Sequence, residues 1–235
     1  MLADNPRDGS AIRIYNYQSG KLLKVLKSHT NIINDLVFSS NGKYLISGSA
    51  DKTAKIWRVK DFTLQETVKF HTNYVYAVKI IEKEGNYFAV TAGYDNRIVL
   101  YSMQTKKIVK SHKLPYKLKY LAISQNHIAV CGKGKEIQIY NHNLEPIKTI
   151  VSKTKPDGVA YSPNGEFLIA GCTIPPRDVN AYRVNQNYKK IKSFKKHTNA
   201  TMAVTFLDNQ TAISGGGDNK EIYIWDIKTA QVLKK

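Results

Sequence analysis

Short apolar runs separated by polar turns extend along the whole chain. In residues 43–58, an apolar run that begins at Leu45 is followed by a polar turn at 47–52 and by a second run that ends at Trp57. The same arrangement returns in residues 211–226. Alternation over a few residues is typical of strands with one buried face, and turn residues recur about every 8–12 residues. The pattern predicts an all-β chain without helices.

These strands belong to a repeating unit. Six aromatic residues each close a short apolar run, at intervals of 42, 44, 39, 42 and 43 residues. They are Tyr15, Trp57, Tyr101, Tyr140, Tyr182 and Trp225. Histidines keep the same period at His29, His71, His112 and His197, and all of these except His112 begin the letters HTN. A unit of about 40 residues is too small to bury its own apolar faces, so such units are expected to stack.

The pattern resembles the WD-repeat β-propeller family, in which each repeat forms a four-stranded blade. The resemblance implies a buried structural tetrad of His, Ser or Thr, Asp and Trp. Three repeats supply matching sets: His29, Ser47, Asp51 and Trp57; His71, Thr91, Asp95 and Tyr101; and His197, Ser214, Asp218 and Trp225. The two repeats between them depart from it. Val130 and Gly134 replace Ser and Asp in one, and the other has no histidine and carries an insertion at 174–177.

The resemblance implies one propeller domain over residues 1–235. We expect a half-blade at 10–28 and five complete blades at about 29–70, 71–111, 112–151, 152–196 and 197–235. Residues 1–9 are predicted to form a loop. Five and a half blades do not close a ring. We therefore expect a fragment or an open arc; the alternatives are imperfect closure and a partner chain or further blades that complete the ring.

Composition narrows the class of protein. With 235 residues and 42% apolar residues, the chain can bury a substantial core. It has no apolar run long enough for a membrane helix and no signal peptide, so we expect a cytoplasmic or nuclear protein. Cys131 and Cys172 lie in apolar runs and are expected to be buried and reduced. No Cys/His cluster has zinc spacing, so no metal site is expected.

No catalytic motif stands out, and we expect neither an enzyme nor a cofactor. The resemblance instead implies a protein–protein interaction scaffold. In that family, partners dock on the face formed by the loops that carry the histidine and the Asp. By position, this face should present Asn31, Ile32, Tyr74, Tyr76, Tyr94, Lys113, Tyr116, Lys117, Lys155, Lys195 and Lys196.

Two other functions stay open. The formal net charge is +18, and lysines are dense in residues 105–119 and 188–197. Such stretches suit edge strands, but a basic surface also attracts nucleic acid or phosphorylated and acidic partners. An AT-biased coding sequence, which favours lysine codons, would give the same charge without a binding role. The chain could also be the propeller part of a larger regulated enzyme.

Overall fold

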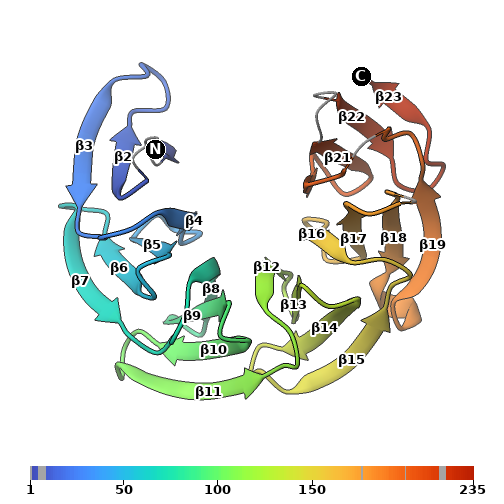
Figure 1. The fold of residues 1–235 in the computed structure, drawn as a ribbon. Coiled ribbons are helices and arrows are strands. Elements are labelled where there is room, and N and C mark those ends of the chain that lie inside the picture. The colour runs from blue at the N-terminus through green and yellow to red at the C-terminus, as the bar shows by residue number, and fades with distance from the viewer. Residues whose placement is uncertain (1, 5–8, 176, 199, 217–220) are drawn as a thin grey trace. The chain divides into compact units, whose positions relative to one another are not determined.

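The structure is a computed structural model that describes residues 2–4, 9–175, 177–198, 200–216 and 221–235. It forms two compact units, residues 1–118 and 119–235, which are described one at a time. Nearly all regular structure in the described residues is antiparallel β-sheet (Figure 1). The predicted all-β class is confirmed. The predicted single domain and the closure of its ring stay predictions.

The first unit contains three sheets. A three-stranded sheet has the order β1-β2-β3, and two four-stranded sheets have the orders β4-β5-β6-β7 and β11-β10-β9-β8. The strands are β1 Leu2–Asp4, β2 Ala11–Tyr15, β3 Leu22–Lys27, β4 Ile33–Phe38, β5 Tyr44–Ser49, β6 Ala54–Arg58, β7 Thr63–Val68, β8 Val75–Lys83, β9 Asn86–Gly93, β10 Arg97–Ser102 and β11 Lys107–Lys113.

The second unit contains three four-stranded sheets with strands in chain order, β12 to β15, β16 to β19 and β20 to β23. The elements are β12 Leu118–Ile123, β13 His127–Gly132, β14 Glu136–Asn141, β15 Pro146–Val151, β16 Pro156–Tyr161, β17 Phe167–Cys172, β18 Val179–Arg183, the 3-10 turn η1 Val184–Gln186, β19 Lys189–Phe194, β20 Ala203–Phe206, β21 Thr211–Gly216, β22 Glu221–Asp226 and β23 Val232–Lys234.

Two local expectations are wrong. Residues 1–9 were expected to be a loop, but Leu2–Asp4 pairs with β2 in the register Leu2↔Tyr15. The predicted half-blade therefore has a third strand. A helical turn also occurs at Val184–Gln186, where none was expected. Both segments have three residues, which is too short for any hydrophobic period to appear in a sequence.

Every sheet carries a bulge in its outer strand beside the aromatic marker. In the sheet of β4–β7, Ile56 pairs with Glu66 but Trp57 pairs with Leu64, so Gln65 is left over. The same register shift accompanies Tyr15, Tyr101, Tyr140, Tyr182 and Trp225. An extra residue bends a strand and increases its twist. The aromatic period therefore marks a repeated backbone device as well as a repeated side chain.

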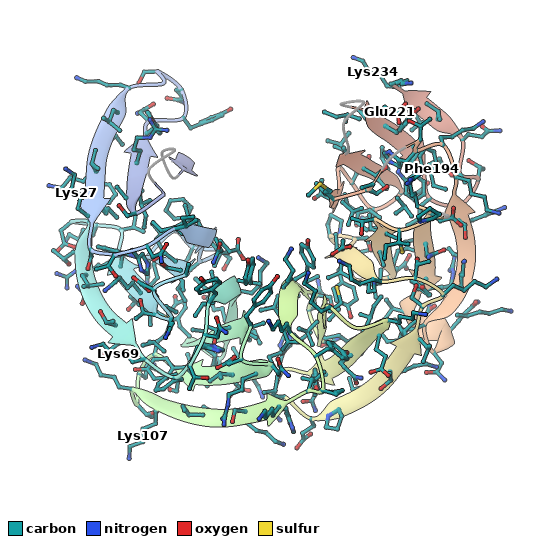
Figure 2. The ribbon with its side chains drawn as sticks, viewed as in Figure 1. Lys27, Lys69, Lys107, Phe194, Glu221 and Lys234 are labelled. Carbon is teal, nitrogen blue, oxygen red and sulfur yellow. The ribbon has the colours of Figure 1, made fainter. Side chains whose placement is uncertain are left out.

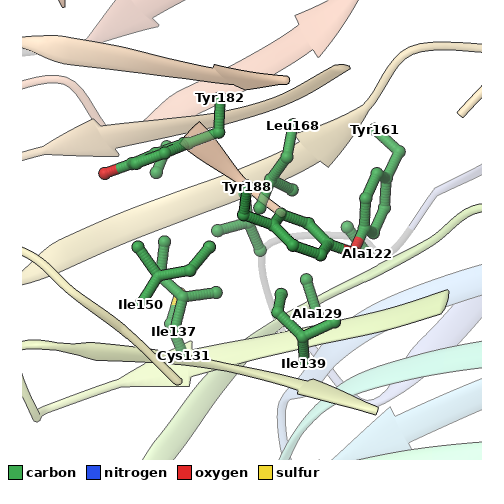
Figure 3. Close-up of a cluster of buried hydrophobic side chains, with 12 residues drawn as sticks. Ala122, Ala129, Cys131, Ile137, Ile139, Ile150, Tyr161, Leu168, Tyr182 and Tyr188 are labelled. Carbon is green, nitrogen blue, oxygen red and sulfur yellow. The ribbon is translucent and has the colours of Figure 1, made fainter. Parts of the chain in front are cut away.

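The hydrophobic core of each unit lies between neighbouring sheets. In the first unit, Ile46 of β5 packs with Val75 and Val78 of β8. A Cβ added at Gly48 would lie 2.8 Å from a Val78 methyl carbon, so only glycine allows this approach. In the second unit, one cluster joins Ile137 and Ile139 to Leu168 and neighbouring tyrosines (Figure 3). Each buried aliphatic side chain contributes about 1.5–3 kcal/mol.

Candidate partner-binding face

The first complete repeat contains a closed polar network. His29 Nδ1 lies 2.6 Å from Asp51 Oδ2, and His29 Nε2 lies 2.7 Å from Ser47 Oγ. Trp57 Nε1–H donates to the same Ser47 oxygen at 3.1 Å. A single proton on Nδ1 satisfies the set, because the Ser47 hydroxyl then donates to Nε2 and Nδ1–H donates to Asp51. The Thr30 backbone N–H also donates to Asp51, at 3.1 Å.

The second repeat keeps part of this network. His71 Nδ1 lies 2.9 Å from Asp95 Oδ1, and His71 Nε2 lies 2.7 Å from Thr91 Oγ1. Tyr101 stands in the position of Trp57, is buried, and packs against the Phe70 ring at 5.1 Å. Burial raises the pKa of its hydroxyl. A tyrosine has no indole N–H to donate to the threonine, so this repeat replaces one hydrogen bond with aromatic packing.

Hydrogen bonding sets the protonation of the two aspartates. Burial alone would raise the pKa of Asp51, but hydrogen bonds from His29, Thr53 and the Thr30 backbone hold it well below its usual range. Asp95 has the same balance, with His71 as its main hydrogen-bonding partner, and its pKa is lowered as well. Both carboxylates are thus ionised and already occupied, and are poorly placed to attract a cationic partner.

The last repeat has a different acid at the histidine loop. His197 Nε2 lies 2.7 Å from Ser214 Oγ, to which Trp225 Nε1–H also donates at 3.1 Å. The predicted Asp218 lies outside the described residues. Glu221 accepts the Thr198 backbone N–H at 3.1 Å, the role that Asp51 has for Thr30. That bond leads the interactions that lower the pKa of Glu221 to about 2.

Three predicted face residues of the first unit meet at one end of the sheet of β8–β11, and we call Tyr74, Tyr76 and Tyr94 the tyrosine cluster. The rings of Tyr76 and Tyr94 stack at 4.2 Å between centroids, and Tyr74 lies 6.3 Å from Tyr94. Lys117 Nζ lies 5.1 Å from the centre of the Tyr94 ring, a cation–π contact. Tyr74 is 40% exposed. The turn after β9 is joined to the loop before β8, because Tyr94 N–H donates to the Tyr74 carbonyl at 2.9 Å.

The other predicted face residues of the first unit are not among the three tyrosines that contact one another. Asn31 and Ile32 are exposed in the loop before β4, where the Ile32 carbonyl accepts the Ala50 N–H at 2.8 Å. This bond matches the one between Tyr94 and Tyr74. Lys113 is exposed at the end of β11, and Tyr116 is half-buried in the next loop.

In the second unit, Lys155 pairs with Asp157 at 2.8 Å, while Lys195 and Lys196 are exposed beyond β19. Lys155 therefore forms an ion pair within the fold, which the repeat pattern did not predict. Figure 2 labels Lys27, Lys69 and Lys107, which project outward from outer strands or the loops that follow them in the first unit. All three of these lysines are exposed.

The sequence pattern did not predict a series of hydrogen bonds that joins His127, Tyr188 and Tyr161. His127 opens β13, and its Nδ1 lies 2.9 Å from the Tyr188 hydroxyl, which lies 2.9 Å from the Tyr161 hydroxyl. Tyr188 follows η1 with a positive φ of 58°. Nothing in the repeat pattern marks these residues, because the contacts join different sheets of the second unit.

The described residues contain neither a metal-binding cluster nor a membrane-spanning helix. No group of three or more His, Cys, Asp or Glu side chains in this part of the chain is placed to hold a metal ion. No helix in the same residues is long and apolar enough to cross a membrane.

Comparison with known proteins identifies the family to which the repeats of this chain belong. The family model described as WD domain, G-beta repeat matches residues 20–58, 62–102 and 188–226. The matches pass over residues 103–187, where the tetrad residues are replaced. Together the matched segments cover half of the chain.

Curated relatives are longer proteins. The chain is 28% identical over 135 residues to WD repeat-containing protein 89 homolog of Dictyostelium discoideum, covering 55% of this chain and 36% of that protein. It is 24% identical over 198 residues to nuclear distribution protein nudF of Aspergillus niger, covering 84% and 40%. Mouse Jouberin is 32% identical over 102 residues, covering 43% and 10%. The chain thus spans less than half of the length of each.

Proposed function

The chain belongs to the WD domain, G-beta repeat family, and from this premise we propose that it is a non-catalytic scaffold that binds a protein or peptide segment at the tyrosine cluster. The observation that carries the proposal is the contact of Tyr74 in the loop before β8, Tyr76 in β8 and Tyr94 in the turn after β9. Tyrosine offers a large contact area at a low cost in conformational entropy, and it is enriched where interfaces gain most of their affinity.

The charges around the cluster favour an acidic partner. Asp95, beside Tyr94 in the sequence, is hydrogen-bonded to His71. Lys117 projects over the Tyr94 ring and is exposed. The carboxylate at this site is therefore occupied by hydrogen bonds within the fold, while an ammonium group remains available. Complementary charge speeds association and selects partners more than it adds affinity.

The test is partner capture by matched tyrosine variants. Tyr74→Ala is expected to reduce recovery of the bound proteins at least about tenfold, because truncating an interface hot spot costs about 2 kcal/mol or more. Tyr17→Ala is the control, since Tyr17 is 70% exposed and lies outside the cluster. Quantitative mass spectrometry of affinity-purified complexes measures the ratio.

Two results would count against this function. Equal recovery by Tyr74→Ala and the parent, with both proteins folded, would remove the tyrosine cluster from the interface. Partners that ignore this variant but dissociate at about 200 mM salt would indicate binding by the exposed lysines instead. The lysines of the β19 segment, Lys189, Lys190, Lys192, Lys195 and Lys196, are all exposed and are the first to test in that case.

A further inference from the structure

The sheet of β16–β19 has lost the tetrad entirely. Ser152 precedes β16 by the same number of residues as His29 precedes β4, so a small hydroxyl stands in the place of the imidazole. Ala170 pairs with Asn180, two residues before Tyr182, as Ser47 pairs with Lys55 two residues before Trp57. The serine of the tetrad is thus an alanine here, and the fourth member is a tyrosine.

A cavity of about 330 Å³ is lined by Ser152 and Tyr182, the residues at the His and Trp positions of the lost tetrad. Its wall comes from the end of β15 and the loop after it, from β18 and the residue before it, and from β19 with the residue that precedes it. The residues that matter to its chemistry are Ser152, Lys153, Asp178, Asn180, Tyr182 and Lys190. Figure 3 shows Tyr182 and Tyr188, whose rings form part of the wall.

Asp178 is the unusual group in this wall. It is 7% exposed, and its Oδ1 has no hydrogen-bond partner among the described residues. The preceding Arg177 donates Nη1–H to the Thr198 carbonyl at 3.1 Å. Asn180 is satisfied, because its Oδ1 accepts the Ser193 hydroxyl at 2.9 Å. A buried carboxylate oxygen without a partner is costly, so a cation beside Asp178 Oδ1 would be stabilised.

The lysines around the cavity divide into two kinds. Lys155 is committed to Asp157, with 2.8 Å between Nζ and Oδ2. Lys153 and Lys190 line the cavity, are exposed, and make no ion pair with any described residue. The site therefore offers a carboxylate in its interior and ammonium groups at its solvent side. A simple cation would be repelled at the entrance, and a simple anion would be repelled inside.

We propose that this cavity binds a small zwitterion of the amino-acid class. The ligand's ammonium group contacts Asp178, and its carboxylate faces Lys153 and Lys190. This site is independent of the tyrosine cluster, which lies in the other unit. Ser152 and Tyr182, which stand in the His and Trp positions of the tetrad, both line the cavity, so these two replacements contribute to the space that the ligand would occupy.

Titration by ¹H–¹⁵N NMR tests the proposal with glycine, β-alanine and γ-aminobutyrate, which differ only in the separation of their charges. At least one is expected to give saturable shifts at the amides of Asp178 and Asn180, while methylamine and acetate do not. Asp178→Asn should weaken binding about tenfold or more, because a hydrogen bond to a charged group is lost. Asp208→Asn, an exposed carboxylate outside the cavity, should leave affinity unchanged.

A second variant keeps the test decisive if Asp178→Asn does not fold. Ser152→His restores an imidazole to the cavity and should abolish the shifts. Zwitterion shifts no larger than those from methylamine or acetate would overturn the proposal. So would equal affinity of the parent and Asp178→Asn, or a lower melting temperature of ligand-free Asp178→Asn, which would show that a lysine of the protein already occupies the carboxylate.

Discussion

The sheets β4–β7 and β16–β19 have the same strands, the same bulge beside an aromatic residue and opposite interiors. In the first, His29 connects Asp51 to Ser47, and every polar atom of the set has a partner. In the second, Ser152 stands in the histidine position, and Asp178, at the position of Thr53, has an unpaired oxygen in the wall of a cavity. A four-stranded blade therefore forms without the tetrad, from backbone pairing and the apolar core between sheets.

The second sheet compensates at other positions. Asp157 of β16 is buried, pairs with Lys155 and accepts the Thr173 hydroxyl. At the opposite end of the strand, Tyr161 is hydrogen-bonded to Tyr188 at 2.9 Å. The polar interactions of this blade have moved to its inner strand and its edges. The comparison predicts that equivalent substitutions have unequal effects in the two sheets.

The largest expected difference comes from truncation at the histidine position. His29→Ala leaves the buried Asp51 carboxylate without its main hydrogen-bond donor, and losing a hydrogen bond to a charged group costs about 1.5–3 kcal/mol of unfolding free energy. Ser152→Ala removes one neutral hydroxyl and should cost about 1 kcal/mol or less. Urea unfolding followed by circular dichroism measures both. Equal losses would mean that the two positions have the same structural role.

Acid should unfold the tetrad repeats through their aspartates. The folded-state pKa values of Asp51 and Asp95 are lowered, so their stabilisation is fully present above the unfolded pKa of about 3.9 and is lost as the pH falls below it toward the folded values. Asp51→Asn should therefore flatten the fall in melting temperature below about pH 4. Parallel curves for the parent and Asp51→Asn would contradict this origin of acid sensitivity.

The sequence predicted the repeated architecture well. The five four-stranded sheets expected after the half-blade are present in the described residues, because each apolar run is bounded by a turn of fixed chemistry. In one such turn, Ser39 and Asn41 side chains accept the backbone N–H groups of Tyr44 and Lys43, and Gly42 has a positive φ of 70°. Local hydrogen bonds of this kind can be read from the sequence.

The sites were less predictable, for a physical reason. The stacking of Tyr76 on Tyr94 joins a strand to a turn that is distant in sequence, and periodicity reports only which loops share a face. The cavity beside Asp178 depends on what is missing from one repeat. When Ser152 stands in place of a histidine, the sequence does not show whether neighbouring side chains fill the space that the imidazole would occupy. Lys155 appeared free in sequence but is paired with Asp157.

The most direct test of the contrast between a satisfied network and an unpaired carboxylate is the unfolding free energy of Asp51→Ala and Asp178→Ala, measured side by side without ligand. Asp51→Ala is expected to lose about 1–3 kcal/mol, since His29 and the Thr30 N–H are left unsatisfied. Asp178→Ala is expected to stay within about 0.5 kcal/mol of the parent or to gain stability. A loss at Asp178 as large as that at Asp51 would contradict the account.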